Sequence, residues 1–300
     1  GSPNKPGLPL YPGLPVKPGL QYLFPMLPES RILTCIDNDA GYAVHFFEGQ
    51  KLIRDLALLH DFSPAGFSWF RDCVLSVQPM VSLLKQGEGF GFFLDSEEPR
   101  FKLNFETGFH GQMRAMLTPR AFAHPPGEVH GTCRLVKIQP GREPFQSIVR
   151  ADGLTLPRII NLALEASFQM QSEILVSGES DQSVMFTRLP DGPGGNMPEL
   201  TAKEYRLRHA AAFHDLFTRC LSEPEALAAA LAALGLKLLA VRTITFQCGC
   251  TREALLSILR QLAASGDLPA AAPDEVLETR CEYCGKPYTF TRPELDNPPQ

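Results

Sequence analysis

The chain has 300 residues, 44% of them hydrophobic, and a formal net charge of −5 at pH 7. This length and apolar fraction predict one large domain with a buried core plus a smaller one, or two domains and a tail. The negative charge argues against nucleic acid as the main partner, and no apolar run approaches the roughly 18 residues of a membrane-spanning helix.

The first 30 residues are rich in proline and glycine. The triplet Pro-Gly-Leu begins at Pro6, Pro12 and Pro18, at a six-residue period. Proline removes backbone donors and glycine raises the entropic cost of order, so residues 1–30 are expected to be an extended or disordered tail. A polyproline ligand for a partner protein is the alternative. The segment lacks the continuous apolar core of a signal peptide.

The next part of the chain opens with strand and helix patterns. Residues 31–36 and 42–47 are predicted strands joined by a turn. Apolar residues at helical spacing over 52–59 predict a helix, and Ser63-Pro64 is predicted to open a second one. Pro79 is expected to interrupt that second helix.

Alternating apolar residues continue beyond residue 100. Strands are expected at residues 101–105, 129–138, 145–150, 174–176 and 184–189, and a helix is expected to open at Thr155 as its N-cap. The strands at 129–138 and 145–150 flank Pro140-Gly141 and predict an antiparallel hairpin. The fold class expected for residues 31–198 is therefore α+β, with antiparallel sheets and helices in one domain.

A run of glycine and proline after Asp191 marks the predicted domain boundary. Residues 199–240 are expected to be a helical linker, because Thr201 with Glu204, and Ser222 with Glu225, have the spacing of capping boxes. The apolar residues of these helices are too many to leave in water, so the helices are expected to cover an apolar surface. They include Phe213, Phe217, Leu227, Leu231 and Leu234.

Two close cysteine pairs dominate the C-terminal part. Cys248 and Cys250 are separated by one residue, Cys281 and Cys284 by two, and the pairs lie about thirty residues apart. Four thiolates at this spacing predict a tetrahedral site for one Zn²⁺ in a small domain of residues 241–292, followed by a tail of residues 293–300. Unrelated buried cysteines, or disulfides in a secreted protein, are the alternatives.

The remaining cysteines are single and lie among apolar residues. Cys35, Cys73, Cys133 and Cys220 are therefore expected to be small buried hydrophobes. Together with the predicted metal site, they favour a reducing compartment.

The chain lacks the sequence motifs of common catalytic sites. The glycines between Gly87 and Gly91 have no phosphate-binding lysine, and the seven histidines are dispersed. No enzymatic activity is expected. A nucleic-acid-binding zinc ribbon, or another protein with a purely structural zinc, is the alternative function. However, residues 248–300 hold five Lys or Arg and eight Asp or Glu, which is unfavourable for phosphate contacts.

The segment Phe246-Gln247-Cys248-Gly249-Cys250-Thr251-Arg252-Glu253, followed by Cys281-Glu282-Tyr283-Cys284-Gly285 and Tyr288-Thr289-Phe290, resembles the redox-switch domain of the heat-shock-protein-thirty-three family. Members of this family are redox-regulated holdase chaperones. The resemblance spans about residues 31–292 and is most specific in the cysteine segment.

The resemblance implies a chaperone that binds unfolding proteins under oxidative stress, in the cytoplasm, with no nucleic-acid or membrane partner. One zinc would be held by Cys248, Cys250, Cys281 and Cys284 in the reduced, inactive state. Oxidation would join the same cysteines in disulfides, release zinc and unfold the linker, and the oxidised protein would be a homodimer. The candidate residues for binding client proteins are Phe213, Phe217, Leu227, Leu231 and Leu234.

Overall fold

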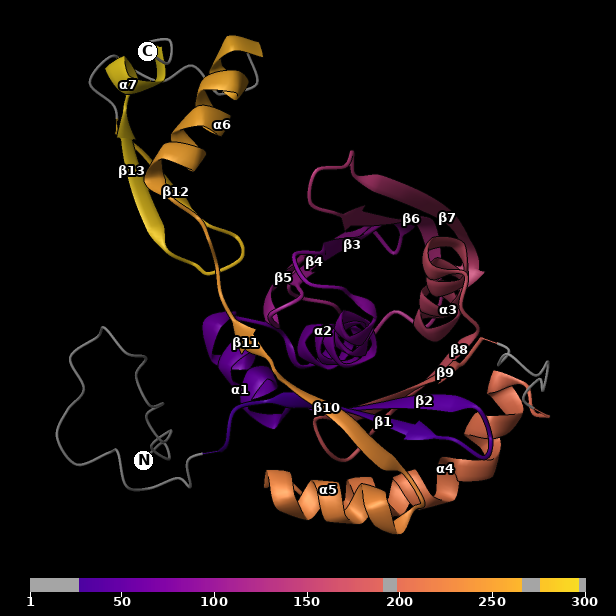
Figure 1. Cartoon of the computed structure of the whole chain (residues 1–300). Helices are drawn as coiled ribbons and strands as arrows, with labels where there is room; N and C mark the ends of the chain where they lie inside the picture. Colours follow the sequence, from indigo (N-terminus) through magenta and orange to yellow (C-terminus); the bar gives the residue numbers. More distant parts are fainter. Residues whose placement is uncertain (1–26, 191–198, 266–275, 297–300) are drawn as a thin grey trace, which may run out of the picture.

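The computed structural model describes residues 27–190, 199–265 and 276–296, within which the strands form three sheets (Figure 1). The first sheet has five strands in the order β10-β1-β2-β9-β8, and every pair in it is antiparallel. These strands are β1 (Arg31–Asp37), β2 (Tyr42–Glu48), β8 (Ser172–Val176), β9 (Gln182–Arg188) and β10 (Lys237–Thr243).

The second sheet has six strands in the order β11-β5-β4-β3-β6-β7. Its strands are β3 (Gly89–Glu98), β4 (Phe101–Gly108), β5 (Gln112–Thr118), β6 (Val129–Ile138), β7 (Phe145–Leu154) and β11 (Thr245–Phe246). Its pairs are antiparallel except that the short β11 runs parallel to β5. The predicted α+β class is therefore confirmed.

The main core lies between these two sheets, with helix α2 inside it (Figure 1). The helices of this region are α1 (Gln50–Leu59), α2 (Pro64–Val77), the 3₁₀ helix η1 (Gln78–Leu83) and α3 (Leu156–Phe168). Phe70 on α2, Phe47 on β2 and Phe92 on β3 are all buried in this core. Apolar side chains from two sheets and a helix thus exclude water together, which is the main driving force for this domain.

Helix α2 begins where the sequence predicts. The Ser63 hydroxyl accepts a hydrogen bond from the backbone N–H of Gly66 at 3.1 Å, and Pro64 occupies the first turn. A side chain at Gly66 would collide with the carbonyl of Arg120. Glycine is therefore needed for the close approach of α2 to the loop that follows β5.

The chain passes from the first sheet to the second at Ile244, which is buried. Its backbone N–H donates to the carbonyl of Ser30 at 2.7 Å, and the next N–H, of Thr245, donates to the carbonyl of Gly111 at 3.1 Å. Gly111 has φ +86°, and a Cβ atom there would collide with the carbonyl of Thr243. Glycine at this turn thus lets β10 and β11 belong to different sheets.

Two helices, α4 (Ala202–Thr218) and α5 (Pro224–Ala233), cover the face of the five-stranded sheet that points away from α2 (Figure 1). Together with the sheet they form a second core. The ring centroids of Phe46 and Phe213 lie 6.4 Å apart, and those of Phe46 and Phe217 lie 5.9 Å apart. The rings of Tyr42 and Tyr205 stack at 4.0 Å.

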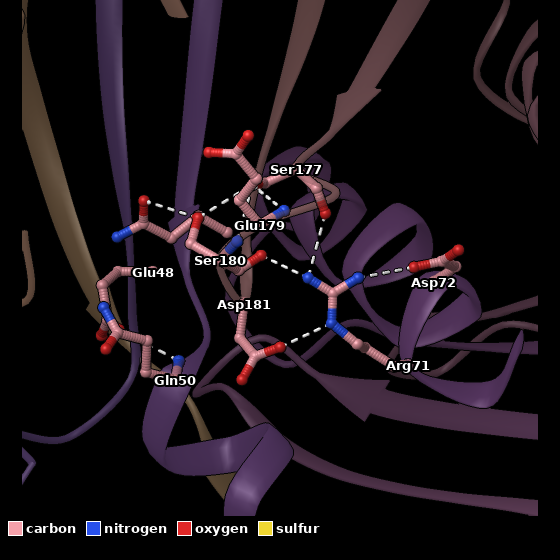
Figure 2. A network of polar contacts seen from close by, with 9 residues as sticks. Glu48, Gln50, Arg71, Asp72, Ser177, Glu179, Ser180 and Asp181 are labelled. Carbon is pink, nitrogen blue, oxygen red and sulfur yellow. Dashed lines mark hydrogen bonds and ion pairs between the residues drawn. The ribbon is translucent and has the colours of Figure 1, made fainter. Parts of the chain in front are cut away.

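A polar network holds the turn between β8 and β9 against helix α2 (Figure 2). Arg71 on α2 donates to the carboxylate of Asp181 and to the carbonyls of Ser177 and Ser180, which fixes the turn between β8 and β9. Beside this turn, the side-chain amides of Gln50 and Gln182 donate to the carbonyls of Cys220 and Leu221, at 3.3 and 2.7 Å.

Glu48 lies buried in the same region, and burial raises its pKa to about 7. One carboxylate oxygen accepts from the backbone N–H of Gln50 at 3.0 Å, whereas the other has no hydrogen-bond partner among the described residues. A carboxyl group in this position favours the protonated state.

Several local predictions are confirmed and others are wrong. The capping box of Thr201 and Glu204 is present in both directions, at 3.3 and 2.8 Å. The second box is absent, because Glu223 is the N-cap of α5 and makes no side-chain cap bond. Residues 241–246 are divided between β10 and β11. The expected tail falls mostly outside the described residues, but Ser30 is buried and its hydroxyl accepts from Leu52 N–H at 3.0 Å.

Strand β3 is absent from the elements predicted from the sequence. Gly89 and Gly91 lower its strand propensity, yet Phe90, Phe92 and Leu94 alternate inward and are buried. Neither the predicted boundary at residues 191–195 nor residues 1–26 lie within the described structure. Among the helices that are described, none is both long and apolar enough to cross a membrane.

Replacing Phe213 tests how strongly α4 is held on the sheet. We expect Phe213→Ala to lower the free energy of unfolding by about 3–5 kcal/mol, since it removes a buried aromatic side chain and leaves a cavity. Leu207→Ala on the same helix is the control, because Leu207 is 56% exposed and its loss should change stability by about 0.5 kcal/mol or less. Urea denaturation followed by circular dichroism measures both; equal effects would contradict the docking of α4 through Phe213.

Candidate metal centre

The two cysteine pairs flank helix α6 and strand β12 in the sequence and meet in space. Cys248 and Cys250 follow β11, and helix α6 (Arg252–Ser265) begins directly after them. Cys281 and Cys284 lie in the turn between β12 (Val276–Arg280) and β13 (Pro287–Thr291), which form the third sheet, and α7 (Arg292–Asp296) follows. All four sulfur atoms lie within 4.8 Å of one another. The Cys248–Cys281 and Cys250–Cys284 sulfur atoms are 3.7 and 3.4 Å apart.

Local backbone bonds shape each pair. The N–H of Gly285 donates to the carbonyl of Cys281 at 2.7 Å, and the N–H of Cys281 donates to the carbonyl of Lys286 at 3.0 Å. Gly285 has φ +69°, a conformation that glycine adopts without strain. On the other side, the Thr251 hydroxyl accepts from the N–H of Ala254 at 3.1 Å and caps α6.

The four sulfur atoms differ in their surroundings. Burial raises the pKa of Cys250, but hydrogen bonds from Tyr288 and the neighbouring thiols outweigh it and bring the pKa down to about 7. Tyr288 Oη lies 3.1 Å from this sulfur. Burial raises the pKa of Cys248 and of Cys284, and hydrogen bonds to the other sulfurs add to the rise. The cluster therefore favours negative charge first on Cys250.

The donor set fits a metal ion. A tetrahedral shell with metal–sulfur distances of about 2.3 Å places its sulfur atoms about 3.8 Å apart, close to the 3.7 Å between Cys248 and Cys281. The four sulfurs come from two turns that bring them within 4.8 Å of one another. The four cysteines could thus bind a metal ion and leave no coordination position open.

The metal-binding module, defined here as residues 247–265 and 276–296, has a small core of its own. Its buried residues are Leu259, Cys281, Tyr288, Phe290 and Leu295. One of the five is itself a proposed metal ligand. Apolar burial therefore contributes much less to this module than to the first domain.

A contact that the sequence analysis missed joins the module to the six-stranded sheet. Tyr283, between the cysteines of the second pair, donates a hydrogen bond from its Oη to the Glu106 carboxylate at 2.6 Å. The Arg114 guanidinium lies 4.4 Å from the centre of the Tyr283 ring and donates to Glu106 at 2.7 Å. Arg120 also donates to the carbonyl of Glu282 at 3.1 Å.

The same contact lies beside the cysteine cluster, because Arg114 also interacts with the Cys248 side chain. Burial and the bond to Glu106 together raise the pKa of Tyr283, so its hydroxyl stays protonated and donates. Glu106 and Tyr283 are 177 positions apart in the chain. Nothing in the local sequence of either residue signals their meeting.

The other residues singled out in the sequence lie away from this centre. Phe213, Phe217, Leu227 and Leu231 are buried against the five-stranded sheet, and Leu234 packs against the same core while partly buried. Cys35, Cys73 and Cys133 are buried, as expected. Cys220 is exposed, so its prediction as a core residue is wrong. It follows Arg219, the C-cap of α4, and has φ +50° where the chain turns toward α5.

Comparisons with known proteins agree with this architecture. The family model described as "Hsp33 protein" matches residues 30–291. The 33 kDa chaperonin of Methylobacillus flagellatus is 22% identical over 152 residues, which are 50% of this chain and 51% of the relative. That of Streptococcus equi subsp. equi is 30% identical over 104 residues, or 35% of this chain and 36% of the relative. The chain thus spans about half, or about a third, of the curated relatives it matches.

A solved structure shares the fold. The 33 kDa chaperonin of Thermotoga maritima is similar with a TM-score of 0.63 at 16% identity, covering 90% of this chain and 97% of that one. At this identity the likeness shows the fold alone.

The four single cysteines give a direct test of the local structure. We expect iodoacetamide to label Cys220 rapidly in the folded, reduced protein, and to label Cys35, Cys73 and Cys133 slowly. The thiolate is the reactive form of cysteine. Burial raises the pKa of the Cys35 thiol to about 11 and of the Cys133 thiol to about 12, so few of these thiols are ionised. Peptide mapping by mass spectrometry reports each site, and labelling in urea is the control. Equal rates at all four in the folded protein would contradict the assignment.

Proposed function

The chain belongs to the Hsp33 family, and we propose that it is a redox-regulated holdase chaperone that binds unfolding proteins and prevents their aggregation under oxidative stress. The observation that carries the proposal is the cluster of four cysteine sulfurs within 4.8 Å of one another. It lies in a module with little core of its own, attached to helices whose apolar faces are docked on the first domain.

The metal is proposed to be one Zn²⁺ per chain, held by Cys248, Cys250, Cys281 and Cys284. Thiolates prefer soft or borderline metals, and zinc accepts a closed four-sulfur shell. When bound, the ion keeps all four sulfurs deprotonated and supplies folding energy to the module. Tyr288 would then act as an outer partner, since its hydroxyl hydrogen-bonds to the sulfur of Cys250.

The proposed switch is oxidation of these thiolates. A peroxide transfers one oxygen atom to a thiolate sulfur, giving a sulfenic acid and hydroxide. A neighbouring thiolate then attacks that sulfur, the S–S bond forms and a second hydroxide leaves. Each sulfur has partners within 4.8 Å, so a resolving thiolate is present wherever the first oxidation occurs. A disulfide removes two ligands, and the module loses the bonds on which its folding depends.

Unfolding of the module would reach the linker through the backbone. Residues 234–247 run from α5 through β10 and β11 to the first metal-binding cysteine. Helices α4 and α5 would then leave the five-stranded sheet and expose both apolar faces, including Phe213, Phe217, Leu227, Leu231 and Leu234. These exposed faces are the proposed binding surface for client proteins, without any catalytic step.

The proposal includes the organisation of the chain. Residues 31–198 would be the chaperone core, 199–240 the linker and 241–292 the redox-switch domain, although β10 also completes the core sheet. The protein would reside in a reducing compartment such as the cytoplasm, where the resting thiols remain reduced. When oxidised, it would form a homodimer.

Metal content tests the ligand assignment. We expect one zinc per chain in the reduced protein. Cys281→Ser should weaken zinc binding by at least about 100-fold, because the loss of a hydrogen-bond partner of a ligand already lowers metal affinity by up to about 100-fold. Cys220→Ser is the matched control and should keep full zinc. Metal analysis with competition by a chromogenic chelator measures both; full zinc affinity in Cys281→Ser would contradict the assignment.

Light scattering tests the chaperone activity. After treatment with hydrogen peroxide and mild warming, the protein should suppress the aggregation of a thermally unfolding client at near-equimolar ratio, whereas the reduced, zinc-loaded protein should have little effect. Dithiothreitol, which reduces the disulfides, added together with Zn²⁺, should abolish the suppression of aggregation. If oxidation expels zinc and aggregation continues unchanged, the site is a structural zinc centre and the protein is not this kind of chaperone.

A further inference from the structure

A single buried carboxyl group lies on the face of the five-stranded sheet that α4 and α5 cover. Along β2, the side chains of Tyr42, Val44 and Phe46 belong to the second core, whereas that of Phe47 belongs to the main core. Because side chains alternate between the two faces of a strand, Glu48 falls on the same side as Phe46, toward the linker helices α4 and α5. Its side chain is fully buried.

The loop between α4 and α5 is held on both sides of Glu48. The partner of Glu48 on β9 is Gln182, whose side-chain amide donates to the carbonyl of Leu221 at 2.7 Å. Two residues after Glu48, the side-chain amide of Gln50 donates to the carbonyl of Cys220 at 3.3 Å. Departure of the linker helices would break both bonds and open Glu48 to water.

The hydrogen bonds of Glu48 are too few for a buried carboxylate. One oxygen accepts from the backbone N–H of Gln50 at 3.0 Å (Figure 2), and the other has no partner among the described residues. An ionised carboxyl group can accept about four hydrogen bonds, and a buried charge that lacks partners is costly. The neutral acid avoids most of this cost.

Burial raises the pKa of Glu48 from an ordinary value of 4.5 to about 7, and the charged groups around it do not cancel this effect. Arg31 lies opposite on β1 and favours the charged form, but its guanidinium donates to the carbonyl of Glu29 at 2.8 Å. Asp181 opposes the charged form. The remaining charged residues of the surrounding elements pair elsewhere or are exposed; they are Lys51 and Arg54 on α1, Glu179 before β9, and Arg219 and Glu223 beside the linker loop.

From this placement we propose that docking of the linker helices is coupled to protonation of Glu48: the helices dock over the neutral acid, and ionisation of Glu48 favours their release. The inference rests on the proposed function and adds a second input, the pH, to its redox switch. Loss of the metal would free the module, and the pH would then determine what fraction of the linker helices leaves the sheet.

The direction of the effect follows from the state in which the charge is costly. Undocking returns the carboxylate to water, so the docked state binds the proton more tightly than the undocked state. Protonation therefore supports docking fully below pH 4.5, and this support is lost as the pH rises through about 7. Acidification should keep the linker helices docked, whereas neutral and alkaline pH should favour their release.

Hydrogen exchange measured by mass spectrometry tests the coupling in reduced, zinc-free protein. Exchange times are scaled for the pH dependence of the intrinsic rate. In the wild type, protection of residues 202–233 should fall by about tenfold between about pH 5.5 and pH 8.5, because one proton is released on undocking. Glu48→Gln, which keeps the shape of the neutral acid, should give a flat profile and stronger protection than the wild type at the alkaline end.

Glu173→Gln is the matched control, because Glu173 is a second carboxylate of the same interface. It accepts from the guanidinium of Arg206 on α4 at 3.1 Å. Loss of this ion pair should lower the protection of residues 202–233, but the pH profile should stay parallel to that of the wild type. Glu48→Met, with an apolar side chain of similar length, repeats the test and should also give a flat profile.

The outcomes separate this inference from the proposed function. If residues 202–233 exchange faster after zinc removal to the same extent at every pH, the inference is wrong while the proposed switch stands. Parallel profiles for Glu48→Gln and the wild type would also overturn it, as would equal flattening by Glu173→Gln. Loss of protection at every pH in both Glu48→Gln and Glu48→Met would do the same, because a neutral side chain must dock at least as well. Full protection after zinc removal at every pH would mean that the proposed release itself fails.

Discussion

The meeting of four cysteine sulfurs is the constraint on which the rest of this structure depends. The metal-binding module has five buried residues, too few to offset the chain entropy of its helices and hairpin by apolar burial. Bonds between sulfur and a metal ion can supply that free energy, and they can be withdrawn by oxidation of the same sulfurs. A module held in this way is stable or unfolded according to the redox state of its ligands, whereas the first domain is stabilised by a large core in either state.

The path of the backbone determines how far such a change can spread. Directly before Cys248 the chain contributes β11 to the six-stranded sheet, and before that β10 to the five-stranded sheet. Both are edge strands, so each pairs on one side alone. Helices α4 and α5 precede them and pack on the outer face of the five-stranded sheet. Unfolding of the module would therefore first destabilise the edge strands β10 and β11. Helices α4 and α5, which cover the second core, would be destabilised next.

The sequence predicted those features that depend on neighbouring residues. The spacing of the cysteine pairs, the capping box at Thr201 and most strands of the first domain follow from local chemistry, and the structure places the four sulfurs together. Strand β3 was missed because its glycines mask the alternation of Phe90, Phe92 and Leu94. The exposure of Cys220 depends on a turn between two helices. The contact of Tyr283 with Glu106 joins residues 177 positions apart, and only the fold brings them together.

The central claim is that docking of α4 and α5 depends on the metal ion. Hydrogen exchange measured by mass spectrometry tests it most directly, on reduced protein before and after zinc is removed by a chelator, so that no disulfide forms. The account predicts faster exchange in residues 202–233 and 245–291 after zinc removal, with strands β2, β3 and β4 unchanged. Full protection of residues 202–233 in protein that has lost its zinc would contradict it.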